Sequence, residues 1–138
     1  RVMSGFAELS LHPDVVPGMR VLSAEGVRLA TLSNGAPGVA EQLLRTAGIR
    51  SSFERVLSVE DAGIWKPAPA VYHYAAAELG VEPAELLMVA AHPWDLHGAH
   101  HAGLQTAWIN RDGRPYPATM HRPDHIVDCV SSLAAVIT

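Results

Sequence analysis

Short apolar runs alternate along this chain with longer segments in which apolar residues recur every three or four positions. The short runs predict buried strands, and the helical spacing predicts helices that pack through one face. Strands are expected over residues 27–32, 53–59, 86–91, 106–110 and 126–130. Helices are expected over residues 14–25, 37–48, 67–80 and from the turn at 92–94 to about 103, with a final helical turn over 131–137. This alternation predicts an α/β fold with a mainly parallel sheet.

Residues with special backbone preferences mark where these elements begin and end. Gly26 is a good stop for the first helix, and Pro67 is well placed to open the third. Residues 1–13 show no clear period and are expected to be a lead-in segment, whereas residues 111–123, rich in proline and glycine, are expected to form a long loop. Residues 86–91 form the most apolar run and are the best candidate for a central strand.

The composition narrows the class of protein. The 138 residues suit one domain over residues 1–138, and with 49% apolar and 17% charged residues the chain is expected to be globular. A net charge of −4 argues against nucleic acid or an anionic membrane as a partner. No segment reads as a membrane span or a signal peptide. The single cysteine, Cys129, cannot form an internal disulfide, which fits a cytoplasmic location.

Polar residues stand in turns that follow three of the predicted strands. The first turn offers Ser33 and Asn34, the second offers Lys66, the only lysine, and the third offers Asp95. Because such turns meet at the carboxyl edge of a parallel sheet, where open α/β folds bind ligands, we expect these side chains to converge on one crevice. Each also has a structural alternative. Ser33 or Asp95 could cap a helix, Asn34 could serve turn geometry, and Lys66 could lie on the surface.

Four ordered segments carry a more specific signal: LATLSNG (29–35), WKPAPAVY (65–72), LLMVAAHPWDLHGAHHAG (86–103) and TAWINR (106–111). Together they resemble the haloacid dehalogenase superfamily, most closely its L-2-haloacid dehalogenase (type II) branch. The resemblance covers nearly the whole chain and implies a Rossmann-like core with helices on both faces of the sheet. It also implies hydrolysis of short (S)-2-haloalkanoic acids to 2-hydroxy acids. In that family an aspartate on the first strand displaces halide, and water then hydrolyses the ester.

The resemblance assigns roles to the residues of the first two turns. Ser33 would hydrogen-bond the substrate carboxylate, since a hydroxyl can donate to an anion without adding charge. Asn34 would help to hold the departing halide, because a preorganised N–H donor stabilises the negative charge that builds there. Lys66 corresponds to the family lysine beside the nucleophile, where its positive charge keeps the attacking aspartate ionised.

Three further residues are matched in the same way. Asp95 corresponds to the family acid that pairs with the lysine and orients the site. Trp94 resembles the aromatic residue that lines the halide and alkyl pocket, although core burial explains a tryptophan there nearly as well. Tyr72, six residues after the lysine, is placed to hydrogen-bond the lysine or a carboxylate, with core packing as the alternative.

The third turn departs from the family pattern. Dehalogenases carry a Ser-Ser-Asn-Gly-Trp-Asp type of turn, and here Ala90 and His92 replace the serine and asparagine that help to place the nucleophile and the hydrolytic water. His92 could act as a donor or as a base, because imidazole titrates near neutrality, or it could be structural. Phosphatases of the superfamily hold magnesium with two aspartates at this turn, and Ala91 replaces the first. No cofactor is therefore expected, and magnesium would be needed only by a phosphatase.

Histidines are frequent in the helix after this turn. His97 and His101 lie four residues apart on one helix face, a spacing that suits a zinc pair. No cysteine and no H-E-x-x-H pattern accompanies them. A solvent-exposed, histidine-rich helix that includes His100 is therefore the favoured interpretation, with no metal site.

The resemblance also implies residues that the sequence does not offer. No aspartate within residues 1–26 sits on an apolar strand followed by the family's threonine turn, and Asp14 looks like a helix start. The first strand with its nucleophile and the cap domain are therefore expected to be absent. Because that strand is central in the family sheet, its absence would leave two central edges unpaired. The chain alone is expected to be inactive, or to assemble as a homo-oligomer or with a complementing N-terminal segment.

Two alternatives to dehalogenation stay open at this point. One is a superfamily phosphatase acting on a small phosphorylated metabolite with magnesium. The other is a catalytically dead remnant that serves as an oligomerising or binding module. Magnesium-dependent turnover would indicate the first, and self-association without turnover would indicate the second.

Overall fold

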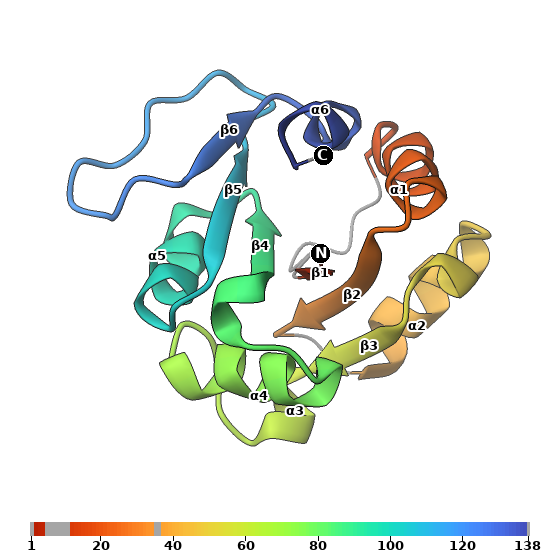
Figure 1. Ribbon diagram of the computed structural model, residues 1–138, viewed down its shortest axis with the longest axis horizontal. Coiled ribbons are helices and arrows are strands. Elements are labelled where there is room, and N and C mark those ends of the chain that lie inside the picture. The colour runs from red at the N-terminus through yellow and green to blue at the C-terminus, as the bar shows by residue number, and fades with distance from the viewer. Residues whose placement is uncertain (1, 5–11, 35–36, 138) are drawn as a thin grey trace.

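The computed structural model describes residues 2–4, 12–34 and 37–137, and within them one curved sheet runs through the molecule (Figure 1). Its six strands lie in the order β3-β2-β1-β4-β5-β6, and each pair of neighbours is parallel. The strands are β1 (Val2–Ser4), β2 (Arg28–Ser33), β3 (Arg55–Ser58), β4 (Leu86–Ala90), β5 (Gln105–Ile109) and β6 (His125–Val127). The predicted α/β fold with a mainly parallel sheet is confirmed.

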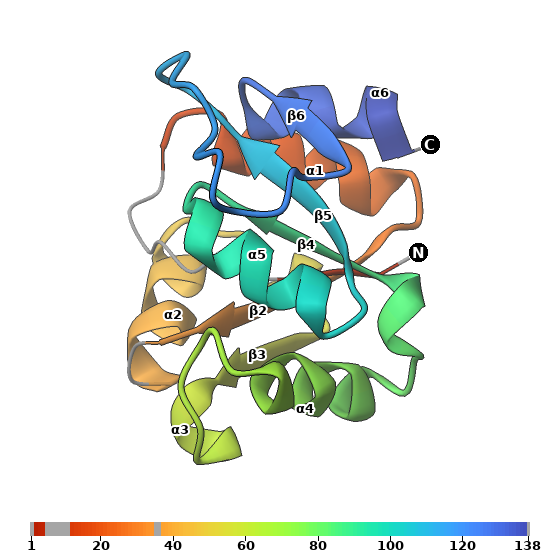
Figure 2. The same cartoon turned by 90° about the vertical axis from the view of Figure 1, so that its left-hand side faces the viewer.

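Helices cover both faces of this sheet, as the resemblance implies. They are α1 (Val15–Ala24), α2 (Pro37–Thr46), α3 (Val59–Ala62), α4 (Pro69–Leu79), α5 (Pro93–His101) and α6 (Leu133–Ile137), with short 3₁₀ turns η1 (Arg50–Ser52), η2 (Pro83–Glu85) and η3 (Val130–Ser132). Figure 1 shows α4 and α5 on the opposite side of the sheet from α1 and α2, and in Figure 2 α5 lies in front of β4 and β5.

Each face of the sheet has its own apolar core. Leu32, Met88 and Leu96 belong to the core beneath α4 and α5, whereas Met19 and Val89 belong to the core beneath α1 and α6. Because successive strand residues point to opposite faces, a strand that is covered on both faces buries every residue. β4 is such a strand, as its apolar sequence predicts.

Two helices begin at positions that differ from the sequence prediction. α4 begins at Pro69 rather than Pro67, because the backbone at Ala68 stays extended. α5 begins at Pro93, so Trp94 stands in its first turn rather than in a preceding loop. In each case a proline lies at the start of the helix, where the backbone N–H would have no partner within the helix and so is not needed.

β3 is also shorter than predicted. It ends at Ser58, whose hydroxyl accepts the Glu60 N–H at 3.1 Å and so caps α3. Val59, the last residue of the predicted strand, is instead the first residue of α3. The loop predicted over residues 111–123 is free of helix and strand, and no helix in the described ranges is both long and apolar enough to cross a membrane.

β1 lies in the centre of the sheet, in the position that the sequence predicts to be empty. Its register pairs Val2 with Arg28 of β2 on one side and with Leu86 of β4 on the other. The prediction that both central edges stay unpaired is therefore wrong, and residues 2–4 are a strand rather than a lead-in segment. The sequence of β1 is Val-Met-Ser, so the strand in this central place carries no aspartate.

Asp14, just before α1, forms hydrogen bonds with the segment that follows β5 and with the start of η3. Its carboxylate accepts two hydrogen bonds from Arg111, each 3.1 Å long, and the Val130 N–H at 2.7 Å. Partial burial raises the pKa of Asp14, but the hydrogen bonds from Arg111 and Val130 outweigh it and hold the pKa below its usual value of 3.8. α1 begins one residue later, as predicted, although this side chain makes no capping bond to its own helix.

Candidate active site

A buried ion pair stands at the carboxyl edge of the sheet. Lys66 Nζ lies 2.8 Å from Asp95 Oδ2, and both side chains are 0% exposed. Lys66 is joined to Pro67 by a cis peptide bond, and Asp95 stands in the first turn of α5. A carboxylate is favoured in that turn because the N-terminus of a helix carries partial positive charge. Since removing either charge from water is costly, each depends on the other for its burial.

Tyr72 of α4 contacts the same carboxylate. Its hydroxyl lies 2.6 Å from Asp95 Oδ1 and 3.0 Å from the Asp95 carbonyl oxygen. Burial above all, and then the negative charge and hydrogen bond of Asp95, raise the pKa of Tyr72 well above its usual value of 10. The phenol therefore stays protonated and donates. Each oxygen of the Asp95 carboxylate thus has a donor, Lys66 on one and Tyr72 on the other.

Gly98 lets α5 approach these residues closely. A Cβ at this position would stand 2.6 Å from Pro67 Cβ, 2.7 Å from Pro67 O and 3.0 Å from the Tyr72 hydroxyl oxygen. Glycine within a helix is unfavourable by about 1 kcal/mol relative to alanine, so this close contact explains its presence. The sequence prediction missed Gly98, although a glycine inside a helical pattern is a known signal of close packing.

Asn34 joins the turn after β2 to the ion pair. Its Oδ1 accepts the backbone N–H of Lys66 at 3.3 Å, so the donors of its amide, on Nδ2, point away from that bond. Ser33 is fully buried, and its hydroxyl has no hydrogen-bond partner among the described residues. The hydroxyl of Thr31, on the same face of β2, is also buried and also has no partner among them. A buried hydroxyl without a partner costs about 1–3 kcal/mol. Such a group is a candidate ligand contact.

His92 ends the turn after β4, and Trp94 stands in the first turn of α5. Their rings stack with centroids 5.8 Å apart and planes inclined by 16°. His92 also lines a cavity of about 190 Å³, which it shares with Asn110, Arg111 and Arg114 from the end of β5 onward. A volume of this order suits a small molecule rather than a drug-sized ligand. Ala91 and His92, four and three residues before Asp95, both line this cavity.

The seven predicted site residues thus fall into two groups. Hydrogen bonds and an ion pair bring together Lys66, Asp95, Tyr72 and Asn34, with Ser33 next to Asn34 in the chain. In the other group, His92 borders the cavity and Trp94 stacks on His92. In the part of the chain that the structure describes, no three acidic, histidine or cysteine side chains are arranged to hold a metal ion.

Known proteins share both the sequence and the fold of this chain. A family model described as haloacid dehalogenase-like hydrolase matches residues 1–103. (S)-2-haloacid dehalogenase 4A of Burkholderia cepacia is 35% identical over 133 residues, which are 96% of this chain and 58% of that protein. The crystal structure of L-2-haloacid dehalogenase RSc1362 matches with a TM-score of 0.85 and 36% identity, over 91% of this chain and 56% of that one.

A further solved structure is that of L-2-haloacid dehalogenase from Xanthobacter autotrophicus with chloropropionic acid covalently bound. It matches with a TM-score of 0.84 and 27% identity, over 91% of this chain and 60% of that one. The chain therefore spans less than two thirds of the length of each of these relatives.

Proposed function

Because the chain belongs to the haloacid dehalogenase-like hydrolases, we propose that it carries part of the active site of a 2-haloacid dehalogenase. The reaction takes a short (S)-2-haloalkanoic acid and water to a 2-hydroxy acid, a halide ion and a proton. The observation that carries the proposal is the buried ion pair of Lys66 and Asp95, fixed by Tyr72. It places a cation at the edge of the sheet where α/β folds bind ligands. The names of the relatives support the substrate class.

The polar side chains of the first two turns bind the substrate and the nucleophile. Lys66 is an ammonium with three N–H donors, so it can serve Asp95 and a second, attacking carboxylate at once. Its charge keeps the attacking carboxylate ionised. The buried hydroxyl of Ser33 donates to the substrate carboxylate, and Asn34 Nδ2 donates to the halide as the carbon–halogen bond breaks.

The third turn acts in the second half of the reaction. The attacking carboxylate forms an ester with the substrate, and water must then hydrolyse that ester. His92 lines the cavity beside this turn and has the chemistry to accept a proton from that water. Trp94, stacked on His92, lines the pocket for the alkyl group and the halide.

The attacking carboxylate is the part of this scheme that the described residues do not supply. β1 is Val-Met-Ser, and Asp95 is bonded through both of its oxygens. We therefore propose that the 138-residue chain alone is inactive, and that activity needs another segment to place an aspartate between β2 and β4, in the position that β1 occupies here. The proposal includes assembly with a second copy or a complementing segment, no cofactor, and a cytoplasmic location.

Halide release from (S)-2-chloropropionate tests this function. The 138-residue chain is assayed alone and as a chimera, joined behind the preceding part of the Burkholderia cepacia relative. We expect no release from the chain alone, release from the chimera, and a large rise in KM in the chimera with Ser33→Ala. The chimera with Arg45→Met, an exposed surface position, is expected to keep its activity.

Other results would point to other functions. Magnesium-dependent phosphate release from p-nitrophenyl phosphate by the chimera, without halide release, would indicate a phosphatase. A folded chimera with neither activity, together with self-association of the 138-residue chain, would indicate a remnant that serves as an oligomerising or binding module.

A further inference from the structure

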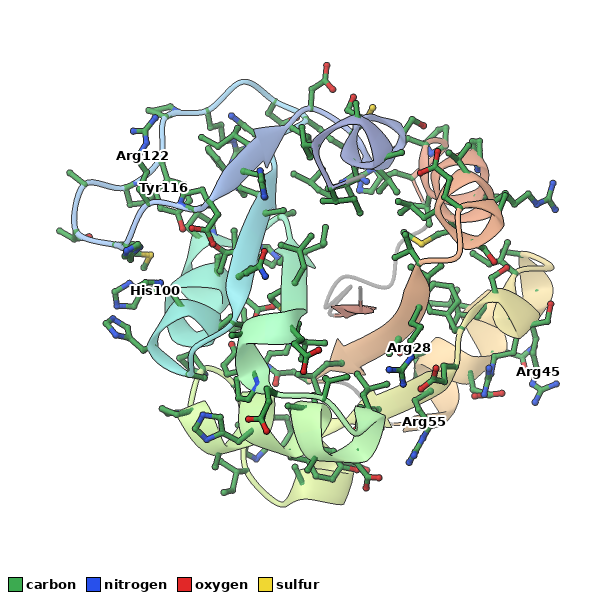
Figure 3. All side chains as sticks on the ribbon, viewed as in Figure 1. Arg28, Arg45, Arg55, His100, Tyr116 and Arg122 are labelled. Carbon is green, nitrogen blue, oxygen red and sulfur yellow. The ribbon has the colours of Figure 1, made fainter. Side chains whose placement is uncertain are left out.

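Four histidines gather where the 111–123 loop runs beside α5. His97, His100 and His101 come from the helix, and His121 comes from the loop. The ring centroids of His100 and His121 are 3.3 Å apart, those of His97 and His101 are 4.5 Å apart, and those of His100 and His101 are 5.4 Å apart. Figure 3 shows His100 on the outer side of α5, beside this loop. The prediction of a solvent-exposed histidine helix is partly wrong, since only His101 of the three helix histidines is exposed.

One contact in this cluster requires a neutral ring. The backbone N–H of His121 donates to His97 Nδ1 at 2.9 Å. A histidine nitrogen accepts a hydrogen bond only while it carries no proton, so His97 must hold its single proton on Nε2. Protonation of His97 turns Nδ1 into a donor, which removes this bond between the loop and the helix.

The neighbouring ring, His100, is also held in its neutral form. Burial first, and then the imidazoles of His121 and His101, lower the pKa of His100, while the carboxylate of Asp124 acts to raise it. The folded protein therefore binds fewer protons here than the unfolded chain does. The contribution to stability is complete above the unfolded value of 6.5 and is lost as the pH falls below it towards the lowered value.

Two other titratable groups lie next to the cluster. His73 of α4 makes a hydrogen bond with the Ala102 carbonyl oxygen at 2.9 Å, and Arg122 follows His121, with its carbonyl oxygen 3.0 Å from His121 Nδ1. Arg122 adds positive charge on the loop side. Among the described residues, Asp124 is the carboxylate that acts to raise the pKa of His100.

The same loop is fastened to the turn that carries part of the candidate site. The Tyr116 hydroxyl donates to the Pro93 carbonyl oxygen at 3.3 Å, and its ring packs edge-on against Trp108, with centroids 4.8 Å apart. The Trp108 Nε1–H donates to the Ala91 carbonyl oxygen at 2.9 Å. The loop therefore acts as a strap that holds α5 and the turn before it.

We propose that this strap is sensitive to pH: the neutral ring of His97 holds residues 111–123 against α5, and protonation of that ring removes the acceptor of the His121 N–H and releases the His121 end. This release removes one of the contacts that hold residues 111–123 near the segment from Ala91 to Asp95, which carries part of the candidate site. This inference does not depend on the reaction that the site catalyses.

Hydrogen exchange of the 138-residue chain tests the proposal at one amide. The protection factor of the His121 N–H is measured by NMR at about pH 7.5 and about pH 5.5, where the intrinsic effect of pH cancels in the ratio to the unfolded rate. We expect it to fall roughly fivefold or more at the lower pH, the change that corresponds to losing one hydrogen bond of about 1 kcal/mol. An unchanged protection factor in the natural chain would overturn the proposal.

Two matched variants assign the change to the cluster. In His97→Asn the side-chain oxygen can replace Nδ1 as an acceptor that never takes a proton, so the fall in protection is expected to vanish. His12→Asn removes an exposed histidine outside the cluster, and it should keep the full change. If His97→Asn shows the same fall as the natural chain, the response comes from other groups and the strap is not controlled by these histidines.

Discussion

Replacing Lys66 by methionine tests the buried ion pair directly. Methionine keeps most of the side-chain volume but leaves the Asp95 carboxylate without its counter-charge. At 2.8 Å and an effective dielectric constant of about 20, two unit charges attract by about 6 kcal/mol, and the cost of burying them offsets much of this. Losing one partner of a buried pair costs about 3–5 kcal/mol in the free energy of unfolding. This is a large part of the roughly 5–15 kcal/mol that stabilises a typical domain.

The assay is urea unfolding followed by tryptophan fluorescence, in which the buried Trp108 reports on the core. Arg45→Met is the control, because its side chain is 64% exposed and its ion pair with Glu41 should contribute less than about 1 kcal/mol. The double variant Lys66→Met with Asp95→Leu removes both charges and should recover most of the loss, since apolar replacement of a buried pair is often neutral. The reasoning is refuted if Lys66→Met costs less than about 1 kcal/mol, or if the double variant loses the sum of the two single changes.

Two further changes test how the fold positions this site. Gly98→Ala should cost about 1–3 kcal/mol in the free energy of unfolding, because the new methyl group overlaps Pro67, although alanine has the higher helix propensity. Gly38→Ala is the control, since the space around Gly38 is open, and it should be neutral or stabilising. Equal effects of the two changes would contradict this account. Asp14→Ala should cost about 1.5–3 kcal/mol near pH 7, because Arg111 loses its carboxylate partner. The pKa of Asp14 lies below 3.8 in the folded state, so the difference in unfolding free energy between the natural chain and Asp14→Ala should shrink as the pH falls below about 4. Urea unfolding of the two proteins over this pH range measures the difference. A difference that does not change with pH would exclude the ion pair as its cause.

Burial on both faces made some elements easy to predict from the sequence. β4 is a continuous apolar run, so its strand assignment over residues 86–91 agrees with the observed Leu86–Ala90 to within one residue. β1 offers no such signal, because three residues cannot show a period. The start of α4 was misplaced because Pro67 and Pro69 carry the same local signal. The extended backbone at Ala68 makes the later proline the first residue of the helix.

In the candidate site, the positions of the residues along the sheet edge could be predicted from the sequence, but their hydrogen bonds could not. That Ser33, Lys66 and Asp95 lie at one edge of the sheet follows from the strand order of parallel folds. The hydrogen bonds do not follow, because the contact of Tyr72 with Asp95 depends on how closely α4 and α5 approach each other. No local pattern reports that distance, and only the glycine at position 98 hints at it.

The central place of β1 has a consequence for how the molecule folds. β2 and β4 each pair with β1, so the sheet consists of a β3-β2 block and a β4-β5-β6 block that three residues join. Val2 must meet both Arg28 and Leu86, and such non-local pairings form late because long loops have to close first. The two blocks can therefore assemble separately around their own crossover helices before they dock. Val2–Ser4 then supplies the backbone hydrogen bonding between the blocks, whereas the two apolar cores, each with residues of both blocks, couple them through side chains and make their unfolding cooperative.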